Sequence, residues 1–172
     1  KIAYKIINSL TLLLSKWREQ LLSTDFTDHT LLHDVSTRWN STHNMLVSFL
    51  EMKEHINAFI DHSSYKLSEY TITDEEWEVI GGLVSALSIL KEATLFFSAD
   101  GANISSVIPA MDAIDEALAS GILNNEILSQ LNRHALAIGK KTLNIYYSLM
   151  DDLDLYCITM VFHPEYKLDY FR

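Results

Sequence analysis

Arg38 and Trp39 are adjacent residues that stand directly before a predicted helix. A guanidinium can bind a phosphate through paired hydrogen bonds, and an indole ring offers a flat surface for a stacked base. Asn40 and Ser41 are residue types that cap helix N-termini, so they would hold this turn in place. These four residues are our candidate DNA contacts. The structural alternative is that Trp39 belongs to the core and that Arg38 stacks on it or pairs with Asp34.

Two histidines have a spacing that could hold a metal ion. His29 and His33 would share one helix face, and Asp34 follows the second of them. They lie beside a predicted loop, however, and no third ligand is evident. We therefore expect no metal site here, and the chain contains no glycine-rich phosphate loop and no His-Glu-x-x-His motif.

Three carboxylates in the C-terminal part, Asp151, Asp152 and Asp154, could attract a divalent cation. At a helix start the peptide dipoles favour negative charge, so such a cluster needs no ligand. Cys157 lies in an apolar run without a neighbouring His or Lys, and we expect a buried thiol rather than a nucleophile. A single cysteine excludes an intrachain disulfide and a cysteine-based zinc finger in this chain, and it fits a reducing compartment.

The 172 residues include 13 basic and 23 acidic side chains, which give a formal net charge of −10. An acidic surface repels phosphate, so any nucleic-acid contact must be local or depend on other parts of the protein. Lys1, Lys5, Lys16 and Arg18 make the first twenty residues basic. The composition, 48% apolar and 21% charged, is typical of a folded globular domain. Because the chain begins with Lys1 rather than Met, we expect it to be part of a longer protein.

Apolar residues recur every three to four positions along most of the chain, and this period predicts helices. The segments run over residues 2–21, 40–62, 74–98, 104–120, 124–149, 151–162 and 165–172. No segment alternates with period two for long enough to predict a strand. We therefore expect an all-α protein, an irregular helical bundle of about six to seven helices. The apolar stretches are amphipathic and broken by charge, so we expect no transmembrane span and no membrane partner.

Local signals refine this prediction. Thr73 and Glu76 have the spacing of a capping box, in which each side chain bonds to the backbone amide of the other residue. Gly81–Gly82 inside the next helix favours close packing against a neighbouring helix, with a kink or hinge as the alternative. Pro109 requires its helix to start late or to kink, and Gly121 is expected to close that helix.

Two of the predicted helices have a well-defined stripe of mostly apolar residues along one face. The first helix carries on one face Ile2, Ile6, Leu10, Leu13, Trp17 and Leu21. The long helix from about residue 124 carries on one face Leu128, Leu131, Ala135, Ile138, Thr142, Ile145 and Leu149.

The segment Asp34–Thr42, followed by Met45 and Leu46, resembles the signature of hAT-superfamily DNA transposases, typically Asp-x-x-Thr-Arg-Trp-Asn-Ser-Thr. Further segments resemble the family in the same order and span nearly the whole chain. They are Leu12–Arg18, Glu76–Ser98, Ile104–Pro109 with its Ile-Ser-x-Val-x-Pro pattern, and Ile158–Phe171. In the last segment Thr159, Phe162 and His163 replace the commoner Ala, Leu and Asp.

The resemblance implies a piece of a cut-and-paste transposase. Such proteins have a BED zinc finger, an RNase H-like core with three carboxylates and a divalent metal such as Mg²⁺, a helical insertion domain and a C-terminal dimerisation region. By this resemblance, residues 1–32 are the helix leading out of the core plus a loop. Residues 33–172 are the helical insertion domain, which ends in the His-Pro-x-x-Lys-Leu-x-x-Phe motif. Trp39 would stack on a base extruded during hairpin formation, with Arg38 as the phosphate contact.

We therefore expect a nuclear transposase fragment that helps to bind DNA ends and handle hairpins through Arg38, Trp39, Asn40 and Ser41. The catalytic carboxylates, the zinc finger and the dimerisation region are expected outside this chain, so we expect no catalysis and no cofactor from it alone. The expected partners are transposon-end DNA and a second copy, joined through the missing C-terminal region. The alternative is a domesticated or decayed remnant that acts as a helical protein-interaction module, which the net charge favours. An independent hydrolase or metalloenzyme is a third hypothesis.

Overall fold

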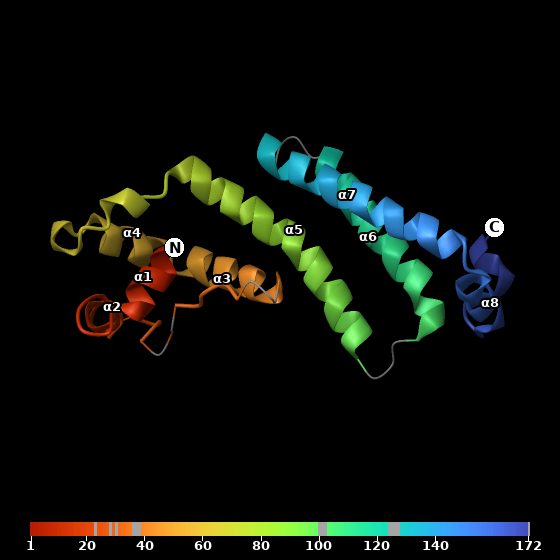
Figure 1. Cartoon of the computed structure of the whole chain (residues 1–172), viewed down its shortest axis with the longest axis horizontal. Coiled ribbons are helices and arrows are strands. Elements are labelled where there is room, and N and C mark those ends of the chain that lie inside the picture. The colour runs from red at the N-terminus through yellow and green to blue at the C-terminus, as the bar shows by residue number, and fades with distance from the viewer. Residues whose placement is uncertain are drawn as a thin grey trace. The chain divides into compact units, whose positions relative to one another are not determined.

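The computed structural model describes residues 1–22, 24–27, 29, 31–35, 39–99, 103–123 and 128–171, without the side chains of Trp39, Ile122, Leu123 and Phe171. This described part contains eight α-helices and no strand, which confirms the all-α prediction (Figure 1). The chain divides into two units, Lys1–Val84 and Ser85–Arg172. The predicted boundary between residues 32 and 33 concerns the domains of a parent protein and stays a prediction.

The first unit contains four helices, two short 3₁₀ turns and the start of a fifth helix. In chain order they are α1 (Ile2–Asn8), α2 (Leu13–Leu21), α3 (Trp39–Glu51), α4 (Lys53–Asp61), η1 (Ser63–Tyr65), η2 (Ser68–Tyr70) and α5 (Asp74–Ser98). The second unit contains the end of α5, then η3 (Ile104–Ser106), α6 (Val107–Leu123), α7 (Gln130–Asp151), α8 (Asp154–Phe162) and η4 (Lys167–Phe171).

One continuous hydrophobic core holds the first unit together. Trp17 of α2 and Phe59 of α4 pack edge to face at its centre, with ring centroids 5.3 Å apart. The stripe predicted for residues 2–21 is buried with one exception, because Leu10 is 73% exposed. The chain leaves the helix at Ser9 and resumes it at Leu13, so the single predicted helix is two helices and Leu10 lies in the turn between them.

The second predicted helix is also divided. Met52 separates α3 from α4 with a non-helical backbone (φ −100°, ψ 17°). The apolar stripe nevertheless continues across the break, since Phe49, Met52 and Ile56 are all buried. The bend lets two short helices present one apolar face to the same core.

The predicted capping box starts α5. The Thr73 amide donates to Glu76 Oε2 at 2.9 Å, and the Glu76 amide donates to Thr73 Oγ1 at 3.2 Å. Of the two glycines that follow, Gly82 is buried, which fits close packing. A Cβ added at Gly81 would meet no atom within 4 Å, so packing does not require a glycine there.

Helices α6 and α7 run side by side in the second unit (Figure 1). Asn103 and Ser106 form a capping box at η3, and α6 begins only at Val107. Pro109 therefore lies in the first turn of α6, where its missing N–H breaks no helical hydrogen bond. Gly121 lies inside α6, which continues to Leu123, so the prediction that Gly121 closes this helix is wrong.

The face of α7 that meets α6 is identified by three contacts. Lys140 pairs with Asp115 of α6, the Tyr147 hydroxyl donates to Asp112 at 2.6 Å, and buried Leu136 lies against Gly121. The stripe predicted from the sequence lies on the other side of the helix. Its large members within α7 are more than half exposed: Leu131 70%, Ile138 56%, Ile145 57% and Leu149 57%. Leu128, which precedes α7, is half-buried beside Gly121.

One helix in the described part, α5, is long and apolar enough to cross a membrane by length and composition, with a mean hydropathy of 1.6 over 18 residues. That window includes Lys91 and Glu92, and charged side chains are costly at the centre of a bilayer. The start of α5 also contributes Trp77 and Ile80 to the core of the first unit. Only 6% of that window is buried inside the structure, so the expectation of no transmembrane span stays a prediction.

Candidate nucleic-acid interface

Hydrogen bonds tie the first turn of α3 to the segment before it. Asp34 Oδ1 accepts from Thr42 Oγ1 at 2.6 Å and lies 3.2 Å from Ser41 Oγ. The Ser41 hydroxyl accepts from the Val35 amide at 2.8 Å and lies 3.1 Å from the Val35 carbonyl oxygen. This brace, formed by Asp34, Val35, Ser41 and Thr42, fixes the incoming chain against the helix.

The four predicted contact residues have different outcomes. Asn40 and Ser41 were expected to cap this helix. Because α3 begins at Trp39, both lie within its first turn instead. Ser41 joins the brace, while Asn40 is half-buried and its Oδ1 atom has no hydrogen-bond partner among the described residues. Arg38 and the side chain of Trp39 lie outside the described residues, so whether the indole is exposed stays untested. The brace also contains three residues of the family-like signature that we had not singled out as contacts, namely Asp34, Val35 and Thr42.

The rest of α3 anchors this turn in the core. His43 is 5% exposed and Phe49 is 7% exposed, while Met52 at the end of the helix is 1% exposed. A first turn on a helix that is buried on one face is held in position more precisely than a loop would be. Asp34 and Val35, which are both exposed, are thus bonded to a helix that is anchored in the core.

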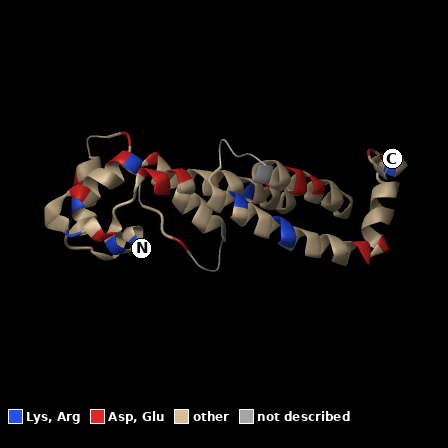
Figure 2. Cartoon of the chain, turned by 90° about the horizontal axis from the view of Figure 1, so that it is seen from above, with Lys and Arg blue, Asp and Glu red and all other residues tan. Residues whose placement is uncertain are grey.

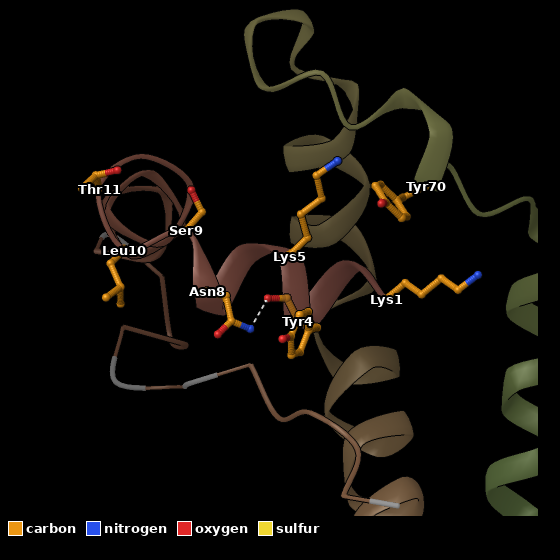
Figure 3. Close-up of a pocket in the computed structure, with 8 residues that line it drawn as sticks. All are labelled: Lys1, Tyr4, Lys5, Asn8, Ser9, Leu10, Thr11 and Tyr70. Carbon is orange, nitrogen blue, oxygen red and sulfur yellow. Dashed lines mark hydrogen bonds between the residues drawn. The ribbon is translucent and has the colours of Figure 1, made fainter.

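A second feature of the first unit is an open hollow of about 920 Å³ beside α1 (Figure 3). Tyr4 is 66% exposed there, and its carbonyl oxygen accepts from Asn8 Nδ2 at 2.8 Å. The hollow combines lysines, tyrosines and small polar side chains, and it is lined by Lys1, Tyr4, Lys5, Asn8, Ser9, Leu10, Thr11 and Tyr70. Such a surface offers ammonium groups to phosphates and ring faces to bases.

Lys5 is the most constrained cation of this hollow. Its Nζ lies 3.0 Å from Glu69 Oε1 and 4.8 Å from the centroid of the Tyr70 ring, toward which it reaches in Figure 3. The hydrogen bond with Glu69 raises the pKa of Lys5, and the same bond lowers the pKa of Glu69. Glu69 thereby offsets the charge of Lys5. Sequence reasoning marked Lys1 and Lys5 as basic but missed Tyr70 and Glu69, because they lie more than sixty residues away along the chain.

The candidate metal ligands are not brought together. No group of three or more His, Cys, Asp or Glu side chains in the described part could hold a metal ion. His29 packs edge to face on Phe26 with centroids 5.1 Å apart, and His33 is exposed. The acidic cluster was expected to start a helix, but only Asp154 stands in the first turn of α8. Asp151 is the last residue of α7 and Asp152 is its C-cap, so this prediction is wrong for both of them.

Cys157 corrects one prediction. The thiol was expected to be buried, but it is exposed. Only Met160 is fully buried along α8, because this helix packs on its neighbours by one narrow face and Cys157 lies off that face. Its apolar neighbours in the sequence, such as Ile158, are exposed as well.

One of the comparisons with known proteins matches a range close to that of the first unit. Residues 4–86 match the family model described as the ZBED1 RNase-like helical domain, a range that coincides closely with Lys1–Val84. A protein of Talaromyces stipitatus named "Putative transcriptional regulator tpeD" is 28% identical over 142 residues. The aligned region is 81% of this chain but only 14% of that protein, so the chain corresponds to a small part of its relative. No solved structure gives a significant match. The matches support a relationship with the hAT/ZBED family, through a first unit that is similar to the ZBED1 RNase-like helical domain.

Proposed function

We propose that this chain is the helical region of a hAT-type DNA transposase, or of a protein derived from one, and that it contacts DNA at the start of α3. The observation that carries the proposal is the brace of Ser41 and Thr42 with Asp34. It fixes the chain on both sides of the Arg38–Trp39 pair, which is what a fixed phosphate and base contact requires.

In this proposal each residue has a separate task. Arg38 binds a backbone phosphate through its planar guanidinium, and Trp39 stacks on an unpaired base. The hollow beside α1 supplies further contacts through Lys1 and Tyr4. A local arrangement of this kind is needed because the net charge of −10 repels nucleic acid elsewhere.

The reaction itself would be carried out by other parts of the parent. Two-metal phosphoryl transfer needs carboxylates that converge on two cations, and the described residues contain no such group. We accordingly assign this chain a role in holding and shaping DNA in the nucleus, with the BED finger, the catalytic carboxylates and Mg²⁺ contributed by the parent.

Binding of fluorescent single-stranded and hairpin DNA, followed by anisotropy at low salt, tests the proposal. Trp39→Ala and Arg38→Ala should each weaken binding by about tenfold, the equivalent of one lost stacking or charged contact. Arg18→Ala is the matched control, since it removes an exposed arginine from α2 of the same unit and should change binding little. Circular dichroism must show unchanged helicity. Equal affinities for all variants would reject DNA contact at α3.

The brace gives a second variant with a distinct readout. Thr42→Val keeps the side-chain shape but removes the bond to Asp34, so DNA binding should weaken while the helix content stays constant. Thr94→Val on α5 is its control, because it also removes a threonine hydroxyl bond, to the Leu90 carbonyl oxygen. Equal DNA affinity of both variants would mean that the brace has no part in DNA binding.

The second candidate function is a domesticated or decayed remnant that works as a protein-interaction module. The acidic net charge and the name of the Talaromyces relative favour it. The sequence and the activity of the parent protein distinguish these two candidate functions. A parent that has the three RNase H-like carboxylates and nicks transposon ends with Mg²⁺ is a transposase, whereas a parent that lacks them and still binds DNA is a derived regulator.

A further inference from the structure

The outer face of α7 carries an uncharged stripe that nothing in the second unit covers. It consists of Leu131, Ala135, Ile138, Thr142, Ile145 and Leu149, and all six residues are exposed. Successive members are separated by four, three, four, three and four positions. This is the heptad spacing of a helix that packs along a second helix, whereas the face of α7 turned toward α6 is a different one.

The stripe is complementary to itself when two copies run antiparallel. With the pair centred on residue 140, Leu131 lies opposite Leu149, Ala135 opposite Ile145, and Ile138 opposite Thr142. Each small residue therefore meets a large aliphatic one, as interdigitated packing requires. An arrangement in which the same patch is used by both copies is the isologous contact of a two-fold dimer.

We propose that α7 pairs with α7 of a second copy of this chain in an antiparallel homodimer. Gly139 flanks the centre of the stripe, and a Cβ added there would meet nothing within 4 Å, so the two helices can approach closely at this point. The stripe spans 18 helical steps, or about 27 Å. Charged residues are few along the helices of the second unit (Figure 2). By sequence, none of the stripe residues is charged. The pairing is independent of DNA contact at α3 and of any dimerisation region elsewhere in the parent.

The size of the helix–helix interface and the charges beside it determine the affinity that we expect for the dimer. One helix pair of this length buries an area near or below the roughly 1,000 Å² that separates stable from transient interfaces. The antiparallel pair also brings Lys141 close to Lys141 of the other copy, which opposes association. We therefore expect a dissociation constant on the order of 10 μM, and we expect association to strengthen as salt screens the lysines.

Sedimentation equilibrium of the full chain, at concentrations on both sides of that value, tests the proposal. Ile138→Glu places a charge at the centre of the stripe and should abolish the dimer. Because Ile138 is 56% exposed, this change should leave the fold intact. Leu95→Glu is the matched control, since Leu95 of α5 is 58% exposed and lies off the stripe. Lys141→Gln should tighten the dimer.

Orientation is tested by cross-linking single-cysteine variants in a Cys157→Ser background with a short bis-maleimide. The antiparallel pair predicts efficient cross-linking of Gly139→Cys with itself. It also predicts that Leu131→Cys cross-links with Leu149→Cys in a mixed sample but with itself only weakly. A dimer that fails with Ile138→Glu, survives Leu95→Glu and shows this cross-linking pattern is the result we expect.

Four outcomes would overturn the proposal. The wild-type chain could remain monomeric at a concentration about tenfold above the expected dissociation constant. Ile138→Glu and Leu95→Glu could weaken association equally, which would indicate general adhesion by exposed apolar side chains. Leu131→Cys could cross-link with itself efficiently, which would indicate a parallel pair. A monomer that instead binds another segment of the parent through α7 also contradicts a homodimer.

Discussion

The two units of this chain bury their apolar residues to very different extents. Among the described residues, most of the fully buried hydrophobic side chains belong to the first unit, where Trp17, Phe59 and Leu67 are 0–1% exposed. The second unit has fewer buried hydrophobic side chains among the described residues, chiefly Leu118, Leu136 and Met160, and it exposes large side chains along α5, α7 and α8. The first unit resembles a domain with its own core, whereas the second has helices whose apolar faces lack a cover.

This difference matches the comparisons and assigns different tasks to the two regions. The segment matched by the ZBED1 RNase-like helical domain coincides with the well-packed unit, which also contains the brace at α3. A rigid support is what a DNA contact needs. Exposed contiguous apolar surface is typical of regions that pack on another protein surface. DNA contact is thus proposed for the first unit and association for the second.

The largest expected effect is a difference in stability between two variants, each of which loses a phenylalanine side chain in one of the units. Phe59→Ala should lower the free energy of unfolding by about 3–5 kcal/mol, because it opens a cavity in a full core. Phe162→Ala removes an equal side chain from a position that is 82% exposed, and it should change stability by less than about 0.5 kcal/mol. Urea denaturation followed by tryptophan fluorescence and circular dichroism measures both. Similar losses in the two variants would show that Phe162 is covered.

Replacing one glycine by alanine in each unit should change the stability by an intermediate amount, with opposite signs in the two units. Gly81→Ala should stabilise α5 by about 0.5–1 kcal/mol, because the new methyl group enters open space and alanine favours helix. Gly121→Ala would place its Cβ 2.7 Å from Leu136 Cδ1, and the forced shift of a buried leucine should cost about 1 kcal/mol net. Thermal denaturation of both variants checks the signs. Stabilisation by Gly121→Ala would mean that Leu136 has room to move.

A pH effect probes the packing of the C-terminal end. Asp112 accepts hydrogen bonds from Tyr147 and from Tyr170, which joins η4 to α6. Burial, followed by these bonds, raises the pKa of Tyr147 and raises the pKa of Tyr170 to about 12. Since the folded pKa values exceed the ordinary value near 10, the neutral phenols stabilise the fold below pH 10, and this contribution is lost as the pH rises toward 12.

Tyrosinate absorbance during an alkaline titration measures this effect. Two tyrosines should ionise later than the others, and Asp112→Asn should lower the pKa of Tyr170 only part of the way, because burial is the larger cause. A single transition near pH 10 for all tyrosines would contradict the contacts between η4 and α6.

Local signals in the sequence predicted the helices well where the chemistry is contained in a few residues. The Thr73–Glu76 box and the late start of α6 around Pro109 follow from hydrogen bonds within one turn. Periodicity identified Trp17 as a core residue, but it could not show that Leu10 lies in a turn between two helices.

Periodicity also could not say which apolar face meets which neighbour. On α7 the regular stripe is exposed, and a mixed face with Lys140 and Tyr147 packs on α6 through polar contacts. The exposure of Cys157 was missed for the same reason. The assignment of Ser41 as a DNA contact stays a prediction. The brace of Ser41 to Asp34 and the pairing of Lys5 with Glu69 depend on tertiary contacts that the sequence pattern does not show.

Hydrogen exchange of the full chain, with and without single-stranded DNA, tests the division of tasks most directly. The account predicts that DNA slows exchange of the backbone amides in residues 34–42 and leaves α7 unchanged. Slower exchange confined to the second unit, or no change at residues 34–42 under conditions where DNA is bound, would contradict it.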